Sequence, residues 1–296
     1  MTSPARACAC ALLTLSLAAM PALASARVPS GTTGDDTIVG NERPNHIMAL
    51  GGRDRVVGNG SDDVIYGGAG NDVLDGGDGN DWITAQPGRD SVTGGLGNDR
   101  IDGGQGDDTV YGGEGDDVLS ANVGDDVVYG ENGNDTLGGN DGNDRLVGGE
   151  GSDKQVGGAG DDWIDAGPGD DGAIQGGPGN DVLIDGDGND WLVKGDEGDD
   201  TVFLGPGADK VFTEQGNDTV YVLADGQPDK IRCDDGGQEQ GGADRVVFVG
   251  TRDPLDVVDP FGTCESVEVV REAPPGWPYG PVARVTPRTA GTDLPR

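Results

Sequence analysis

The sequence predicts an all-β protein, a solenoid of about 21 stacked nine-residue repeats with a small cap at the C-terminal end. Glycine accounts for 58 of 296 residues, whereas aromatic residues make up only 4%. A chain so poor in large apolar side chains cannot bury one ordinary globular core. It is therefore either disordered or divided into many small units that share a thin core. A strict period of nine residues favours the second possibility.

The period is carried by aspartate. Asp recurs every nine residues from Asp36 to Asp171, with Asn45 as the single exception, and the series continues to Asp218 after two one-residue insertions. Glycine usually stands two residues before this Asp, an aliphatic residue stands two residues after it, and another Asp or Asn usually precedes it directly. Residues 34–223 are therefore expected to form one repeat domain.

Each unit has the residues of a tight turn followed by a short strand. Glycine accepts positive φ, and Asn and Asp tolerate it better than other residues, so the first six residues should turn. The last three should point outward, inward and outward, which leaves one interior side chain per unit. Such units must stack, and winding places two of them in each coil, about ten coils in all. We expect one interior wall to contain Ile38, Val56, Leu74 and Val92, and the other to contain Ile47, Ile65, Ile83 and Ile101.

Stacking also predicts the chemistry. An Asp at a fixed place in every coil lies one strand spacing from the Asp 18 residues earlier, and such a column of carboxylates repels itself unless a cation separates its members. Calcium suits these sites because it takes six to eight oxygen ligands in irregular geometry, whereas magnesium demands a tighter octahedron. Divalent ions between neighbouring coils would also offset the formal net charge of −36. The candidate calcium ligands are Asp36, Asp54, Asp63, Asp72, Asp81, Asp90, Asp99, Asp108, Asp117, Asp126, Asp135, Asp144, Asp162, Asp181, Asp190, Asp200, Asp209 and Asp218.

The units resemble the GGxGxDxUx nonapeptide of the RTX, or haemolysin-type, calcium-binding repeat family. Gly67 to Leu74 and Gly103 to Val110 match the whole pattern. The resemblance implies a parallel β-roll, a right-handed β-solenoid in which repeat carboxylates and turn carbonyls hold Ca²⁺ between adjacent turns. The units around Asn45, Asp153 and Asp171 depart from the pattern, so their calcium sites are in doubt. Members of the family usually carry an enzymatic or pore-forming domain ahead of the roll, and only residues 27–33 separate the first unit from the N-terminal segment here.

The N-terminal segment, residues 1–26, has the features of a secretory signal peptide. Arg6 precedes an apolar run from Ala7 to Ala24, and Ala24-Ser25-Ala26 forms a cleavage site. A transmembrane anchor is the alternative, but the run is short and Pro21 interrupts it. We therefore expect a secreted, extracellular protein that has no membrane span.

The regular period fails near Ala224. Apolar strand-like runs follow, and Cys233 and Cys264 lie in the same region. An open solenoid end exposes strand edges and a cross-section of its core, so residues 224–270 are expected to form a cap with one disulfide. Two free thiols, or a small catalytic domain in place of a cap, are the alternatives. Residues 271–296 are rich in proline and are predicted to be a disordered tail.

Composition and motifs argue against an enzyme and against nucleic acid as a partner. The acidic excess repels polyanions, and the only histidine is His46, so a HExxH zinc site or a His-based triad is impossible. No serine lies in a GxSxG motif. A paired-carboxylate glycosidase is the remaining enzymatic possibility, but each repeat Asp already has a place in the period.

The predicted function is calcium binding that folds a secreted repeat protein into a structural rod. The alternative is a calcium-dependent adhesion module that binds an extracellular glycan or protein. Trp82, Trp163 and Trp191 each follow a repeat Asp directly, where side chains should point outward. Two further outward pairs, each one coil apart, are Tyr111 with Tyr129 and Phe203 with Tyr221. Aromatic rows of this kind either grip a partner or pack across strands to stiffen the sheet.

Overall fold

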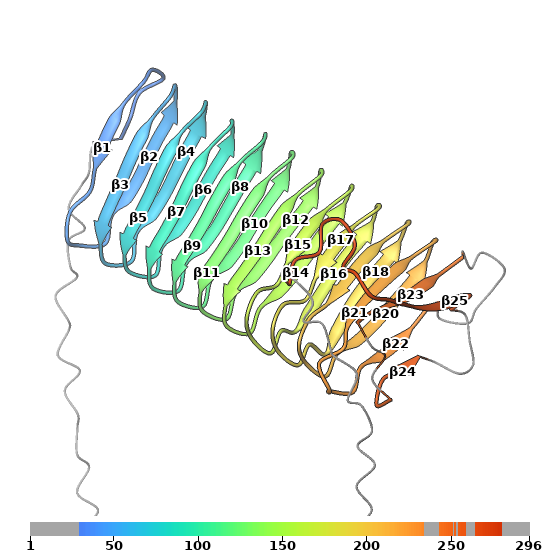
Figure 1. Cartoon of the computed structure of the whole chain (residues 1–296). Coiled ribbons are helices and arrows are strands. Elements are labelled where there is room, and N and C mark those ends of the chain that lie inside the picture. The colour runs from blue at the N-terminus through green and yellow to red at the C-terminus, as the bar shows by residue number, and fades with distance from the viewer. Residues whose placement is uncertain (1–29, 234–242, 251, 253, 259–263, 280–296) are drawn as a thin grey trace, which may run out of the picture.

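The protein is an all-β solenoid made of two long parallel sheets. The computed structural model describes residues 30–233, 243–250, 252, 254–258 and 264–279, and no helix occurs among them. The predicted signal peptide, residues 1–26, lies outside this part of the chain. Figure 1 shows the strands stacked side by side along one axis, with the chain passing alternately between the two sheets. The predicted fold class is confirmed.

One sheet has 13 strands and the other has 12. In order, the first contains β1 (Thr37–Val39), β3 (Arg55–Gly60), β5 (Val73–Asp78), β7 (Ser91–Leu96), β9 (Thr109–Glu114), β11 (Val127–Asn132), β13 (Arg145–Glu150), β15 (Trp163–Asp165), β17 (Val182–Ile184), β19 (Thr201–Leu204), β21 (Thr219–Leu223), β23 (Arg245–Val249) and β25 (Ser266–Val270). The second contains β2 (His46–Gly51), β4 (Val64–Ala69), β6 (Trp82–Pro87), β8 (Arg100–Gln105), β10 (Val118–Val123), β12 (Thr136–Asp141), β14 (Lys154–Ala159), β16 (Ala173–Pro178), β18 (Leu192–Glu197), β20 (Lys210–Gln215), β22 (Lys230–Arg232) and β24 (Val257–Val258).

The register follows the period of the sequence. Val56 pairs with both Ile38 and Leu74, and Ile65 pairs with both Ile47 and Ile83, so neighbours in each sheet are 18 residues apart. The two predicted interior walls are confirmed. The sheets hold 13 and 12 strands rather than the expected ten or so coils, because the winding continues past residue 223.

Each unit contributes a longer strand and more interior side chains than the sequence suggested. Most strands span six residues, and in β6 both Ile83 and Ala85 are fully buried. The prediction of a three-residue strand with one interior side chain is therefore wrong. The second interior position is usually Gly or Ala because the neighbouring coil leaves no room there. A Cβ on Gly103 would lie 2.9 Å from both the Ala121 carbonyl oxygen and Asp108 Oδ2.

Most of the turns involve two residues with positive φ, the first of which lies near the end of the strand. In one unit these are Gly104, with φ of 115°, and Gly106, with φ of 113°. The first of the two positions is not always glycine. Asn59 and Asn122 occupy it with φ of 84° and 83°, which agrees with the tolerance of Asn for this conformation. The glycine-rich half of the unit is the turn that the sequence predicts, although the strand reaches into it.

The insertions lie directly after two repeat aspartates, at Gly172 and Trp191. Gln155 therefore pairs with Ile174, and Ile174 fills the interior with no exposed surface. Ala173, which the nine-residue count places at the interior position, is displaced by one residue and only half-buried.

The segment 224–270, expected to be a separate cap, extends the same two sheets. Its described residues form β22 to β25, and the fully buried Phe248 occupies the interior position that Gly or Ala fills in most earlier units. Cys233 and Cys264 form the predicted disulfide, with their Cα atoms 5.2 Å apart. That this segment serves as a cap remains a prediction.

The start of the proposed tail packs against the roll. Trp277 contacts Phe203, and Tyr279 contacts both Trp277 and the turn after β17. Residues 271–279, which the sequence assigns to a disordered tail, thus include side chains that contact the roll, whereas residues 280–296 lie outside the described part. Within that part, no helix has the length and apolar character needed to cross a bilayer.

Candidate metal centre

The repeat aspartates form two hydrogen-bonded ladders, one ahead of each sheet. The backbone N–H of each Asp donates to Oδ1 of the Asp one coil further on, as from Asp81 to Asp99 and from Asp99 to Asp117, both at 2.7 Å. The first ladder precedes the odd-numbered strands and contains Asp36, Asp54, Asp72, Asp90, Asp108, Asp126, Asp144, Asp162, Asp181, Asp200, Asp218, Asp244 and Glu265. The second precedes the even-numbered strands and contains Asn45, Asp63, Asp81, Asp99, Asp117, Asp135, Asp153, Asp171, Asp190, Asp209, Asp229 and Asp256.

In most of these carboxylates the second oxygen is buried and has no hydrogen-bond partner among the described residues. Oδ2 makes no hydrogen bond within the described part of the chain in Asp54, Asp63, Asp72, Asp81, Asp90, Asp99, Asp108, Asp117, Asp126, Asp135, Asp144, Asp153, Asp162, Asp171, Asp181, Asp190, Asp200 and Asp209. A buried acceptor left without a partner costs about 1–3 kcal/mol, and more when it is charged. Because these atoms recur in coil after coil, they indicate that another chemical group binds them.

Burial raises the pKa of several ladder carboxyls into the neutral range. It raises the pKa of Asp99 and Asp117 to about 7, although the N–H that each accepts opposes the effect and neighbouring Asp charges add to it. For Asp190 and Asp200, the pKa is raised to about 8 by the same causes. Without a cation, much of the ladder would be protonated near neutral pH.

A second, outer row of side chains supports the turns. Where Asp or Asn stands just before a ladder Asp, its side chain often accepts a hydrogen bond from the backbone one coil further on, as Asp116 Oδ1 does from the N–H of Asn134 at 2.9 Å. Asn134 Oδ1 in turn accepts from the N–H of Ser152 at 2.9 Å. This row explains the preference for Asn or Asp before the repeat Asp more directly than tolerance of positive φ does.

The oxygen atoms present fit calcium. The ladder offers carboxylate oxygens, and a backbone carbonyl approaches the same place, because a Cβ on Gly103 would contact both the Ala121 oxygen and Asp108 Oδ2. Hard oxygen ligands from carboxylates and carbonyls are those that calcium prefers. Bound between successive ladder carboxylates, the ion would supply the positive charge and the partner that Oδ2 lacks.

The model of the RTX calcium-binding nonapeptide repeat, which holds four copies of the unit, matches the chain in eight segments. The segments are residues 30–65, 48–83, 75–110, 84–119, 102–137, 138–172, 173–193 and 192–220, and together they cover nearly two-thirds of the chain. The chain belongs to the RTX calcium-binding repeat family. No curated protein matches it.

The structure brings the predicted RTX ligands together with one difference at the N-terminal end. All 18 lie in the ladders, and all except Asp36 are buried. Asp36 is half-exposed, and its Oδ2 accepts hydrogen bonds from the N–H and hydroxyl of Thr32 at 2.5 and 2.9 Å. Asn45 directs its amide N–H toward Asp63 Oδ1 at 2.9 Å, so it presents a donor where a cation needs an acceptor.

The RTX ladder also includes residues that sequence reasoning set aside or missed. Asp153 and Asp171, from units that depart from the pattern, are as buried as their neighbours and keep the same hydrogen bonds. Past the regular repeats the ladders continue through Asp229, Asp244, Asp256 and Glu265. An acidic residue directly before each later strand is the feature that could have identified them. The nine-residue spacing could not, because the later coils are longer.

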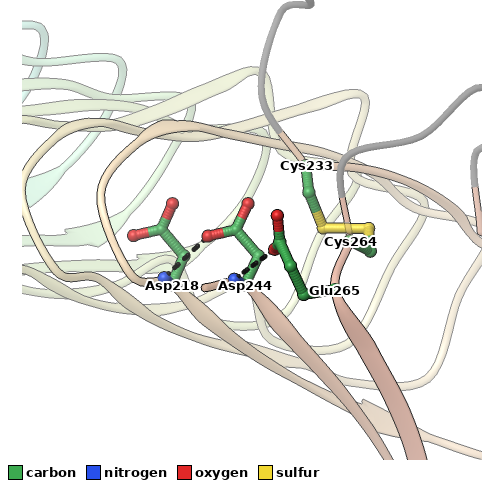
Figure 2. Close-up of a disulfide and its surroundings, with 5 residues drawn as sticks. All are labelled: Asp218, Cys233, Asp244, Cys264 and Glu265. Carbon is green, nitrogen blue, oxygen red and sulfur yellow. Dashed lines mark hydrogen bonds between the residues drawn. A yellow bond between two sulfur atoms is a disulfide. The ribbon is translucent and has the colours of Figure 1, made fainter. Parts of the chain in front are cut away.

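Figure 2 shows the C-terminal end of the first ladder. The N–H of Asp218 donates to Asp244 Oδ1 at 3.0 Å, and the N–H of Asp244 donates to Glu265 Oε2 at 2.7 Å. Cys264 directly precedes Glu265, so its disulfide to Cys233 restrains the last carboxylate of the ladder.

Proposed function

We propose that the protein binds a column of calcium ions along each ladder and folds by doing so into a rod with a structural role outside the cell. The observation that carries this proposal is the row of buried Oδ2 atoms that lack hydrogen-bond partners among the described residues. The membership of the RTX family supports the same ion. A binding and structural role, not a catalytic one, agrees with a sequence whose only histidine, His46, lies exposed beside Tyr66.

Two further features support an extracellular site of action. A disulfide between Cys233 and Cys264 is typical of oxidising compartments, and the N-terminal segment has the composition of a signal peptide. Extracellular calcium modules bind with dissociation constants of about 10⁻⁴–10⁻³ M, which suits a rod that is folded outside the cell and unfolded in the cytosol.

Two substitutions of matched chemistry test the role of the ladder. Asp144 is a buried ladder member with a free Oδ2, and Asp141, three residues earlier, is exposed on the same turn. Circular dichroism during a calcium titration should show a higher midpoint for Asp144→Asn than for the native protein. Asp141→Asn, which removes the same charge, should leave the midpoint unchanged, and magnesium should substitute poorly for calcium. Equal midpoints for both variants would contradict the proposal.

The second candidate function is adhesion, and the exposed tryptophans favour it. Trp82 and Trp191 are 52% and 55% exposed on the side of the 12-stranded sheet. By contrast, Tyr111 and Tyr129 stack on each other with centroids 5.0 Å apart, and the Trp163 ring is covered by Arg145. These contacts agree better with cross-strand packing.

Binding of surface polysaccharide by a variant that combines Trp82→Ala and Trp191→Ala, with its fold checked by circular dichroism, distinguishes the two functions. An adhesive rod should lose binding while its fold is kept. Unchanged binding by the variant would reject these tryptophans as the binding surface.

A further inference from the structure

One aspartate lies inside the roll at a position that the repeat reserves for small or apolar residues. Asp185 comes four residues after the ladder residue Asp181, at the second interior position of its unit. One coil earlier this position is Ala166, and one coil later it is Leu204. Asp185 has no exposed surface. A carboxyl group buried in an apolar interior needs a specific compensating partner.

One oxygen of Asp185 has its partners. Oδ1 accepts from the N–H of Gly205 at 2.7 Å and from the hydroxyl of Tyr279 at 2.8 Å. Tyr279 belongs to the C-terminal segment, drawn in red in Figure 1, which runs back across the roll near β15 and β17. Its hydroxyl accepts from the N–H of Gly186 at 3.2 Å. A Cβ on Gly205 would lie 2.8 Å from the Tyr279 ring, so glycine at this position makes room for the tyrosine.

Asp185 also belongs to a cluster of three acids. One carboxylate oxygen from each of Asp185, Asp190 and Asp209 lies within 4.8 Å of the other two. Oδ2 of all three is buried and has no hydrogen-bond partner in the described part of the chain. Two oxygens bound to one calcium at 2.3–2.6 Å are at most about 5 Å apart, so the three fit around a single ion.

The charges in this cluster require a cation or a proton. Three carboxylates that are buried this close together repel one another. A proton would neutralise one carboxyl group only. Oxygen ligands alone, with no nitrogen or sulfur, select hard cations such as calcium.

We propose that Asp185, Asp190 and Asp209 together bind one divalent cation, with Asp185 as a ligand from inside the roll that a regular ladder site lacks. The inference rests on the proposed function because Asp190 and Asp209 are ladder members. Asp185 adds a third carboxylate that the regular unit does not provide. Tyr279, through its hydrogen bond to Oδ1, is a positioning residue for that ligand.

The experiment counts the ions bound to the full mature protein by native mass spectrometry in saturating calcium. Asp185→Asn keeps the size of the side chain and removes its charge, and it should bind one calcium fewer than the native protein. Asp187→Asn is the matched control because Asp187 is exposed two residues away, and it should bind the native number.

A second variant guards against misfolding of the first. Asp185→Ala introduces the side chain that Ala166 has one coil earlier, and it should also bind one ion fewer. A native ion count in both Asp185 variants would overturn the inference while leaving the ladder proposal intact. Absence of bound calcium in the native protein would instead reject the proposed function itself.

Discussion

Removal of calcium at neutral pH should unfold the roll, and acidification should restore it without calcium. The reason is the state of the ladder carboxyls. In the folded chain Asp99 and Asp117, for example, are buried, their Oδ2 atoms lack hydrogen-bond partners among the described residues, and their pKa values are raised. Either a calcium ion or a proton can remove the charge that burial disfavours.

The size of the effect follows from the pKa values. Burial raises the pKa of Asp99 from 3.8 to about 7. Each unit of a pKa change corresponds to about 1.4 kcal/mol, so ionising Asp99 in the metal-free fold costs about 4 kcal/mol. Asp108 and Asp117 have the same raised pKa, so each carries a cost of similar size, although the costs of Asp99 and Asp117 do not simply add because the charge of Asp117 contributes to the raised pKa of Asp99. A whole domain is usually stable by about 5–15 kcal/mol. A few such groups therefore cost an amount comparable to the stability of a whole domain.

The direction with pH is fixed by the sign of these changes. A carboxyl whose pKa is raised on folding binds its proton more tightly in the folded state. Its contribution to stability is complete below the unfolded pKa of about 4 and is lost as the pH rises toward the folded pKa of about 7 or 8. Calcium affinity should show the opposite trend and weaken on acidification, because protons compete for the same oxygens.

Circular dichroism of calcium-depleted protein at about pH 4.5 and about pH 7.5 measures this directly. We expect β-structure at the lower pH and disorder at the higher one, with light scattering to confirm that the acid form is monomeric. Addition of millimolar calcium at the higher pH should restore the spectrum. A metal-free protein that keeps its β spectrum at about pH 7.5 would refute the reasoning, since the buried charges would then be tolerated.

Three further predictions concern single positions. Asp108→Asn and Asp153→Asn should raise the calcium midpoint for folding to the same extent, because both residues occupy equivalent ladder positions; a smaller effect for Asp153 would show that its unit binds weakly. Gln155→Leu should stabilise the fold in saturating calcium by about 1–2 kcal/mol and so raise its melting temperature, because Gln155 is fully buried and its Oε1 has no partner among the described residues. A lower melting temperature would contradict this. The Cys233–Cys264 bond closes a separation of 31 residues and contributes about 3–4 kcal/mol to stability. Its reduction should increase hydrogen exchange near the C-terminal strands and leave the units from Asp72 to Asp144 protected. Loss of protection along the whole roll would show that the disulfide controls the entire fold.

The sequence predicted the parts of the fold that repeat without interruption. A period of nine identifies Ile38 and Val56 as neighbours on one wall, because every coil between Asp36 and Asp162 has the same length. The period does not reveal how long the strand is. Gly-Gly pairs favour turns in isolation, and only the packing of the next coil explains why the chain stays extended through Gly103.

Prediction was weakest where coil length varies. Asp218 and Asp244 are 26 residues apart yet occupy adjacent rungs of the ladder. The coil that separates them is longer than the regular coil of 18 residues, but the strands keep their register. A fixed period cannot follow such a change. Asp185 and Tyr279 are 94 residues apart and meet through the return of the C-terminal segment, which no local pattern encodes.

The arrangement of the ladders implies that calcium binding is cooperative along each edge of the rod. Asp99 accepts from the backbone of Asp81 and donates its own N–H to Asp117, so each rung contacts the rungs before and after it. An ion that fixes Asp99 therefore places ligands for two neighbouring sites, and each further ion binds to a coil that is already partly ordered. The same geometry limits damage, because a lost rung affects only its nearest neighbours. Toward the C-terminal end, Leu204, Val222 and Phe248 replace interior glycines, so these coils rely more on apolar packing and less on the ion than those near Asp72.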